Sequence, residues 1–337
     1  MGKPTSRDLA IAAGVSLATV DRVLNGRGGV SPDKERRVLE QARRLKINRV
    51  IDPRAARTLR VAVLLQSRAN PFHAAVQDGF EGATRLYPQY NLQFQVHHID
   101  PVRPAATVAL IQALGGHCDA LIIVSSQNED VASALRAWGG QGKPVMTLAT
   151  DIRNADRIAY IGPDNRKAGR VAGDLMARLM GRQGGEIVII SGMLSMIGHE
   201  EREMGFRAVL GERFPQCRVT DVLESLERAE TAGDLVFDAL RRNPEIRGIY
   251  NASAGAQTVV TALKTLGRAD EVVFITHELT DDRRQLIRQG LIDVIIDQRP
   301  ELEVQTAVQA LASYFGRNDH PPVSLVTPID IYMVENA

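Results

Sequence analysis

From Val61 onward, short apolar runs alternate with stretches that have the hydrophobic period of a helix. Seven of these runs, rich in Val, Ile and Leu, are VAVLLQ, ALIIVS, VMTLA, EIVIIS, RGIYN, VVFIT and DVIID. Each is followed by ten or more residues in which apolar positions recur about every 3.6 residues. Strands that alternate with helices build parallel sheets, and strands this apolar are buried on both faces. The pattern predicts a parallel, doubly wound α/β architecture.

The length of this part predicts two lobes. Residues 61–337 number 277, which is more than one sheet comfortably holds, because a single core stops growing at roughly 250–300 residues. In open parallel sheets, ligands bind in the crevice beyond the carboxyl ends of the strands. We therefore expect two doubly wound sheets with a small-molecule site between them.

The formal charge divides the chain at nearly the same place. Residues 1–60 contain 14 Lys and Arg against 6 Asp and Glu, a net charge of +8. The remaining residues contain 27 bases and 34 acids, a net charge of −7. A small basic module joined to a larger acidic one indicates that the basic module binds a polyanion.

The basic module carries the start and stop signals of three short helices. Thr5 and Asp8 have the form of a capping box, while Ser16 and Ser31 suit the caps of a second and a third helix. Apolar residues fall on one side of each helix, so the three are expected to share one core. Two helices joined by a short turn that contains Gly14 form a helix-turn-helix, whose second helix enters the major groove of DNA.

The second predicted helix, Leu17–Leu24, has the side chains that reading DNA requires. Ala18 is small where the helix approaches the bases, and Arg22 is a bidentate donor for guanine. Thr19 and Asn25 are polar groups for phosphate. The alternative is a surface helix of a small bundle with a solvated arginine, and the charge of +8 favours the DNA interpretation.

The segment RDLAIAAGVSLATVDRVLNGRGGVSPDKERRVLEQARRL resembles the N-terminal domain of the LacI/GalR family of bacterial transcription regulators. It matches the pattern A-x-x-A-G-V-S-x-x-T-V-x-R-V-L-N nearly throughout. Asp21 stands where the family usually has Ser, and it would either repel a phosphate or accept a hydrogen bond from cytosine. With the residue types above, the resemblance gives these candidate DNA contacts: Thr5, Ser16, Leu17, Ala18, Thr19, Asp21, Arg22, Asn25 and Leu59.

The hinge of that family is only partly matched. Ile47-Asn48-Arg49-Val50 replaces the usual Tyr-x-Pro-Asn turn, whereas Ala56-Arg57-Thr58-Leu59 matches the A-R-x-L ending of the hinge helix. Asp52 and Pro53 suit the start of a helix. By the resemblance, Leu59 would wedge into the minor groove. The next apolar run begins two residues after Leu59, so the alternative is that Leu59 belongs to the core.

Signatures of enzymes and cofactor sites are missing. The sequence has no G-x-G-x-x-G and no P-loop motif, SGMLSMIG does not meet G-x-S-x-G, and neither HEERE nor HELTD completes H-E-x-x-H. His97 and His98 alternate across a predicted strand, which makes joint metal ligation unfavourable. Cys118 and Cys217 fit structural, reduced thiols. We expect no enzymatic activity, no cofactor and no metal.

Polar side chains that follow the predicted strands suit a neutral, hydroxyl-rich ligand. Amides, carboxylates and an arginine fork satisfy sugar hydroxyls, while an aromatic ring covers the apolar side. Instead of binding a ligand, each of these residues could simply cap a loop. Their recurrence at successive strand ends favours one common binding site. The candidate effector-binding residues are Asn70, Phe72, His73, Asp151, Arg202, Asn251, Ser253, His277, Glu278 and Gln298.

Four motifs extend the resemblance over essentially residues 61–330: ANPFHAAVQDGF, YIGPDNRKAGRVAGDLM, REMGF and DQRPE. They are similar to the effector domain of the same family and to type I periplasmic sugar-binding proteins, especially ribose-like ones. The resemblance implies that most of the candidates above match ligand-contacting positions. Glu278 replaces the usual Asp, and Ala149 stands where another Asp often lies, with Asp151 two residues later.

The sequence thus predicts an N-terminal three-helix helix-turn-helix head and a C-terminal, two-lobed α/β part with doubly wound parallel sheets, type I periplasmic binding protein-like. We expect a DNA-binding domain at 1–48, a hinge or linker at 49–60 and an effector-binding and dimerisation domain at 61–337.

These observations predict a homodimeric transcription regulator, expected to be a repressor, whose partners are operator DNA and a small sugar-like or polyol effector. No stretch of about 18 uncharged apolar residues and no signal region occurs, which predicts a cytoplasmic protein without a membrane partner. The alternatives are a solute-binding protein for sugar uptake and a sugar-acting α/β enzyme.

Overall fold

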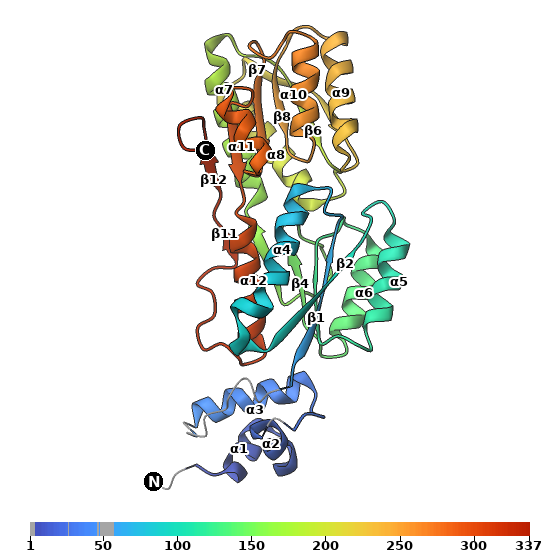
Figure 1. Ribbon diagram of the computed structural model, residues 1–337, viewed down its shortest axis with the longest axis vertical. Helices are drawn as coiled ribbons and strands as arrows, with labels where there is room; N and C mark the ends of the chain where they lie inside the picture. The colour runs from blue at the N-terminus through green and yellow to red at the C-terminus, as the bar shows by residue number, and fades with distance from the viewer. Residues whose placement is uncertain (1–3, 26, 46, 48–56) are drawn as a thin grey trace.

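The computed structural model describes residues 4–25, 27–45, 47 and 57–337. The described chain forms three parts stacked along one axis, with the N-terminal head at one end (Figure 1). Lobe 1 (residues 59–163 and 300–327) lies in the middle, and lobe 2 (residues 165–297 and 330–337) lies at the far end with the C-terminus. This arrangement confirms the predicted head and the two α/β lobes.

The head consists of α1 (Ser6–Ala13), α2 (Leu17–Leu24) and α3 (Pro32–Arg44). The capping box forms as expected, because the Thr5 amide donates to Asp8 at 2.7 Å and the Asp8 amide donates to Thr5 Oγ1 at 3.3 Å. Gly14 ends α1 with a left-handed φ of 63°, a conformation that costs glycine little. Leu9, Val20 and Val38 are fully buried where the three helices meet.

Lobe 1 contains a six-stranded parallel sheet in the order β11-β5-β4-β3-β1-β2. Its strands are β1 (Leu59–Leu65), β2 (Leu92–His98), β3 (Ala120–Ile123), β4 (Val145–Leu148), β5 (Ala159–Pro163) and β11 (Val326–Thr327). Its helices are α4 (Pro71–Leu86), α5 (Pro104–Leu114), α6 (Glu129–Gly139) and α12 (Pro300–Tyr314), with a short 3-10 turn at Pro88–Tyr90.

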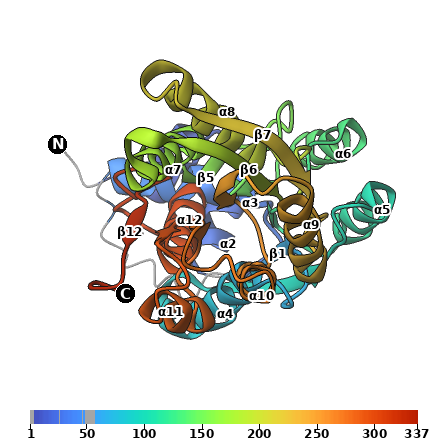
Figure 2. The ribbon, with the colours of Figure 1, turned by 90° about the horizontal axis from the view of Figure 1, so that it is seen from above.

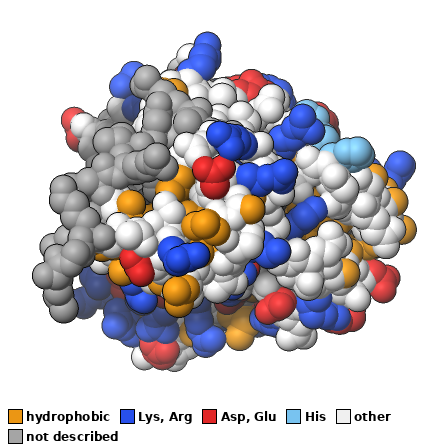
Figure 3. Space-filling view, turned by 90° about the horizontal axis from the view of Figure 1, so that it is seen from below, with side chains coloured by type: hydrophobic (Ala, Val, Ile, Leu, Met, Phe, Trp, Pro, Cys, Tyr) orange, Lys and Arg blue, Asp and Glu red, His pale blue; other side chains and the backbone are white. Residues whose placement is uncertain are grey.

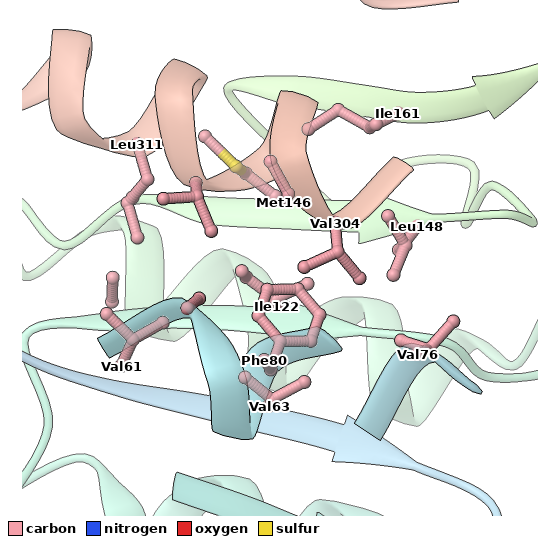
Figure 4. Packing of buried hydrophobic residues seen from close by; sticks show 14 of the residues in the cluster. Val61, Val63, Val76, Phe80, Ile122, Met146, Leu148, Ile161, Val304 and Leu311 are labelled. Atoms are coloured by element: carbon pink, nitrogen blue, oxygen red, sulfur yellow. The ribbon is translucent and has the colours of Figure 1, made fainter. Parts of the chain in front are cut away.

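Alternate residues of β1 enter two different cores, as the period of a strand requires. Val61 and Val63 pack with Phe80 of α4 and Val304 of α12 on one face (Figure 4). Leu64 points to the opposite face, where α5 and α6 cover the sheet. Burial on both faces explains why this strand reads as a continuous apolar run.

Lobe 2 contains a second six-stranded sheet in the order β12-β10-β9-β8-β6-β7. Its strands are β6 (Gly185–Ser191), β7 (Cys217–Glu224), β8 (Ile246–Asn251), β9 (Val273–His277), β10 (Val294–Asp297) and β12 (Asp330–Tyr332). Strand β12 runs antiparallel to β10, and the other pairs are parallel.

The helices of lobe 2 are α7 (Asn165–Met180), α8 (Ile197–Arg213), α9 (Ala229–Arg242), α10 (Ala256–Thr265) and α11 (Asp281–Arg288), with a 3-10 turn at Gly181–Gln183. Helices α7 and α8 cover one face of the sheet, whereas α9, α10 and α11 cover the other (Figure 2). Both lobes are thus doubly wound, and all seven apolar runs of the sequence are strands.

The chain passes between the lobes at three places in the described residues: between β5 and α7, between β10 and α12, and between β11 and β12. Each connection is short. Three neighbouring crossings form a hinge, because they hold the lobes together at one edge and leave the rest of the interface free to open.

Helix α3 of the head is packed against lobe 1. The buried Arg317 Nη2 donates to Glu35 Oε1 at 3.2 Å, and the Arg36 guanidinium lies 4.9 Å from the centre of the Tyr314 ring. Leu39 lies so close to Gly316 that a Cβ on this glycine would be 3.2 Å from the Leu39 Cβ. The contact joins the head to the end of α12 directly.

The structure corrects two predictions about the hinge. Strand β1 begins at Leu59, so this residue and Arg60 belong to lobe 1 and not to the linker. Leu59 has no exposed surface and packs in the lobe 1 core, so its predicted contact with the minor groove is wrong. The physical reason is that the strand needs this apolar side chain. Asp52, Pro53 and Ala56 lie outside the described residues.

Candidate DNA-binding and effector sites

The first turn of α2 presents an exposed surface. Ser16, Leu17 and Ala18 are exposed, and Leu17 keeps half of its surface accessible. Ser16 Oγ accepts a hydrogen bond from the Thr19 amide at 3.1 Å and lies 2.9 Å from Thr19 Oγ1. Ser16 therefore fixes the residue at which α2 begins, and this determines which side chains would face a DNA groove. Thr5 is also exposed at the start of α1.

The outer face of α2 carries a charged network. Asp21 accepts hydrogen bonds from Arg27 Nη1 at 2.8 Å and from Asn25 Nδ2 at 2.6 Å. Its charge is thus paired with Arg27 at the surface, which neither of the two predicted roles anticipated. Arg22 is exposed beside this network. Lys and Arg side chains lie across the visible end of the molecule, with apolar side chains between them (Figure 3).

A pocket lies between the two lobes. With the lobes as they lie in the structure, its cavity volume is only about 40 Å³, smaller than small-molecule sites usually are, so a ligand would need the lobes to part. Lobe 1 contributes the loop after β1 and the start of α4, and lobe 2 contributes α8 and the ends of its strands. The lining residues are Gln66, Asn70, Phe72, His73, Val124, Ala149, Thr150, Met196, Gly198, His199, Arg202, Glu227, Ala252, Ser253, Ala254, Glu278 and Gln298.

Arg202 of α8 lies at the centre of the polar wall and is only 4% exposed. Its guanidinium donates to Asn165 Oδ1 at 2.8 Å, to the Ala252 carbonyl at 3.1 Å and to Gln298 Oε1 at 3.0 Å. All three acceptors are neutral, so the positive charge of Arg202 is oriented without being cancelled by them. A fork held in this way is ready to bind acceptor groups of a ligand.

Glu278 connects this wall to a second arginine. Gln298 Nε2 donates to Glu278 Oε1 at 3.2 Å, and Arg283 Nη1 donates to Glu278 Oε2 at 2.6 Å. The structure thus brings Arg202, Glu278 and Gln298 together, although they come from three separate segments of the chain. Glu278 has a φ of 56°, a backbone strain that is common where a side chain must face a ligand.

A second carboxylate, Glu227, lines the same pocket. Asn70 Nδ2 of lobe 1 donates to Glu227 Oε2 of lobe 2 at 3.2 Å, a hydrogen bond that crosses the cleft. Burial raises the pKa of Glu227 to about 7, and the negative charge of Glu278 adds to this effect. Burial lowers the pKa of His73 and of His199 to about 3, with further contributions from His98 and from Arg202 respectively. Both imidazoles are therefore neutral at physiological pH.

Three of the predicted effector residues lie outside this pocket. Asp151 forms an ion pair with Arg157. The buried Asn251 holds its own loop, because its Oδ1 accepts from the Ser253 amide at 3.1 Å. His277 Nε2 lies 2.7 Å from the Tyr250 hydroxyl, inside lobe 2. A role of these three residues in binding an effector stays a prediction, whereas the other seven candidates line the pocket.

Sequence reasoning missed several lining residues, among them Gln66, Thr150, His199 and Glu227. Gln66 ends the first apolar run, so a search for polar residues directly at strand ends would have found it. Glu227 follows β7, an edge strand whose polar sequence, CRVTDVLE, hides it from a search for apolar runs. His199 lies in the first turn of α8, three residues before Arg202 and on the same face.

Both parts of the chain match known protein families. Residues 5–46 match the family described as "Bacterial regulatory proteins, lacI family", and residues 61–318 match the family described as "Periplasmic binding protein domain". Residues 5–46 thus form a lacI-family domain, and the chain belongs to the family of the periplasmic binding protein domain. The periplasmic binding protein domain is its larger part, and the match to this domain covers more than half of the chain.

Individual relatives of this chain fall into two groups. The chain is 26% identical to the ribose import binding protein RbsB of Salmonella typhimurium, over 72% of this chain and 79% of the relative. It is 28% identical to the catabolite control protein A of Priestia megaterium, over 70% of this chain and 67% of the relative. A putative LacI transcriptional regulator from Bacteroides fragilis superposes with a TM-score of 0.72 at 21% identity, over 83% of this chain and 98% of the other.

The described residues contain neither a membrane-spanning helix nor a cluster of metal ligands. No helix there combines the length and apolar character that crossing a bilayer requires. No cluster of three or more His, Cys, Asp or Glu side chains in that part of the chain is arranged to hold a metal ion.

Proposed function

We propose that the protein is a transcription repressor whose binding to operator DNA is controlled by a small polyol or sugar-like molecule in the pocket between the lobes. The main support for this proposal is that one chain contains both an exposed helix-turn-helix and a buried, polar cleft. Both families matched by the chain are families of regulators and binding proteins, which supports a role in binding. A plain uptake protein has no use for the basic head.

On the DNA side, we infer that α2 enters the major groove by its first turn. Ala18 and the half-exposed Leu17 are suited to the methyl group of thymine, and Arg22 is suited to a guanine edge. Ser16, Thr19, Asn25 and Thr5 would bind phosphates. Asp21 holds Arg27 at the rim of this surface, so its role is to place that cation.

On the effector side, the seven predicted residues that line the pocket suit a ring with several hydroxyl groups. Arg202 and Gln298 are positioned by their protein partners, and Phe72 offers an apolar ring. The similarity to a ribose import binding protein supports a sugar-like ligand. A ligand between the lobes would strengthen contacts such as Asn70 to Glu227 and so favour the closed arrangement.

A homodimer is part of the proposal, because two heads are needed to read two half-sites of an operator. In such a dimer, closure of the lobes would change the relative placement of the heads, which couples the effector to DNA affinity. A role at the operator places the protein with the chromosome in the cytoplasm.

The test measures DNA binding and ligand binding on the same protein. Sugars and polyols are screened by thermal shift, since a ligand at a hundred times its dissociation constant stabilises the folded state by about 2.7 kcal/mol. A stabilising compound is then added to a complex with operator DNA, followed by fluorescence anisotropy. We expect the compound to change the operator affinity at least about tenfold. A compound that stabilises the protein and leaves DNA binding unchanged would contradict the coupling.

A further inference from the structure

We propose that the effector carries a protonated amino group, as an amino sugar or an amino polyol does, and that Glu227 binds this group. The inference rests on the proposed function, because it takes a hydroxyl-rich effector in the pocket as its starting point. It adds a specificity-determining residue and narrows the chemical class of the ligand.

The backbone around Glu227 is built to point its carboxylate into the pocket. Leu226 and Glu227 are two successive non-glycine residues with left-handed φ angles of 53° and 60°. Such strain persists only where the surrounding structure enforces it. Two hydrogen bonds do so, from the Ser225 amide to the Ser191 carbonyl and from the Leu226 amide to the Gly192 carbonyl, both at 2.8 Å.

Because the neighbouring Gly192 has no side chain, there is room for the Glu227 carboxylate. A Cβ built on Gly192 would lie 1.6 Å from Glu227 Oε1 and 2.6 Å from His199 Cε1. No side chain fits at that position while Glu227 keeps its place. The loop therefore holds one acid in one orientation at the cost of local strain, which is the signature of a binding residue and not of a surface carboxylate.

Glu227 Oε1 is buried and has no hydrogen-bond donor among the described residues. His199 Nδ1 is 3.4 Å away, but it accepts a hydrogen bond from the Met193 amide at 3.2 Å. A ring nitrogen that accepts carries no proton, and this imidazole is neutral, so it cannot donate to the carboxylate. We infer that a molecule bound in the pocket supplies the donor that Oε1 lacks.

The ion pairs of the pocket favour a cation as that donor, although the positive charge of Arg202 already offsets part of the rise that burial causes in the pKa of Glu227. Glu278, the other carboxylate, already has Arg283 at 2.6 Å, whereas Glu227 has no Lys or Arg ion pair in the described part of the chain. A buried carboxylate is stable in its charged form only beside an opposite charge with good hydrogen bonds. A hydroxyl supplies one donor, but an ammonium group supplies three and the charge as well.

Other polar atoms of the pocket can bind hydroxyl groups of a ligand. Ser253 Oγ and His73 Nδ1 are buried without partners in the described structure, while the Arg202 guanidinium already donates to three protein acceptors. A serine hydroxyl both donates and accepts, and a neutral imidazole nitrogen does either according to its tautomer, so both suit a hydroxyl group. We therefore place the amino group at Glu227 and the hydroxyl groups toward Ser253, His73 and Arg202.

The experiment compares sugars that differ only in one amino group. Isothermal titration calorimetry near neutral pH measures binding of D-glucosamine against D-glucose, D-galactosamine against D-galactose, and 1-amino-1-deoxy-D-glucitol against D-glucitol. N-acetyl-D-glucosamine, which has nitrogen without charge, is the control ligand. We expect the amine of at least one pair to bind about tenfold or more tightly than its hydroxyl partner.

Variants of the full-length protein then assign the preference. Glu227→Gln keeps the shape of the side chain without its charge and should lose the preference for the amine, whereas Glu227→Asp should keep part of it. Glu245→Gln removes an exposed carboxylate elsewhere in lobe 2 and should change nothing. The melting temperature of each variant without ligand checks its folding, and the wild-type comparison stands even if one variant fails to fold.

The outcomes separate this inference from the proposed function. If neutral members bind as well as or better than every amine, or if Glu227→Gln weakens both members of a pair equally, the amino-group inference is overturned and the regulator with a polyol effector stands. If no member of any pair binds, the inference and the proposed effector class both fail.

Discussion

Replacing Glu227 by Gln should make the protein without effector more stable, and the gain should grow with pH. The side chain is only 7% exposed, and burial raises its pKa from 4.5 to about 7. Below pH 4.5 the carboxyl group is protonated in both the folded and the unfolded chain, so it leaves the free energy of unfolding unchanged. As the pH rises, the unfolded chain releases this proton first, and the folded state becomes less stable.

The size of the effect follows from the two pKa values. They differ by about 2.5 units, and one unit corresponds to about 1.36 kcal/mol. The wild-type protein should therefore lose about 3 kcal/mol relative to Glu227→Gln between about pH 4.5 and about pH 8. Other buried carboxylates, such as Glu303, titrate in both proteins, so the difference between the two isolates Glu227.

The measurement is urea denaturation followed by circular dichroism at several pH values across this range. Glu245→Gln, at an exposed site, serves as the control and should follow the wild-type protein at every pH. If the free-energy difference between wild type and Glu227→Gln does not change with pH, the Glu227 carboxylate is either exposed to solvent or paired with a positive charge. A difference of the opposite sign would mean that a cation of the protein already pairs with it.

Other predictions concern DNA binding and the core. Arg22→Ala should weaken binding to the preferred operator by about 1–3 kcal/mol and to random DNA only slightly, as measured by anisotropy; equal losses would make Arg22 a phosphate contact. Asp21→Ser frees Arg27 and should strengthen binding to random DNA, with a steeper dependence on salt. Leu59→Ala should destabilise lobe 1 by about 2–5 kcal/mol, and unchanged urea stability would contradict its burial. Arg202→Ala should abolish effector-induced thermal stabilisation while operator binding without effector persists.

Much of the fold was predictable because burial leaves a direct mark on sequence. Strands covered on both faces must be apolar throughout, so seven of the eight interior strands were visible as runs. The head was predictable for a different reason, since Thr5, Ser16 and Gly14 are residues whose side chains or φ angles begin and end helices. Strand β7 lies at a sheet edge and has an alternating, partly exposed pattern, which gives no such run.

The site was predictable only in part. The sequence locates a strand end to within a residue or two, but a shift of one residue decides whether a side chain faces the pocket. His277 is the last residue of β9 and points into lobe 2 toward Tyr250. The next residue, Glu278, faces the pocket after one left-handed φ angle. Glu227 depends on a similar pair of angles. Left-handed angles at leucine and glutamate have no signal in composition or periodicity.

The packing of α3 against lobe 1 gives the molecule a long lever. With Glu35 held by Arg317 and Leu39 seated on Gly316, the head turns together with lobe 1 and does not swing on a loose tether. The pivot lies at the three crossings between the lobes, on the side of lobe 1 opposite to the head (Figure 1). A small rotation at the pocket is therefore magnified over the full height of lobe 1 before it reaches α2. Side-chain movements too small to disturb the cores would be enough to carry this helix out of register with a groove of DNA.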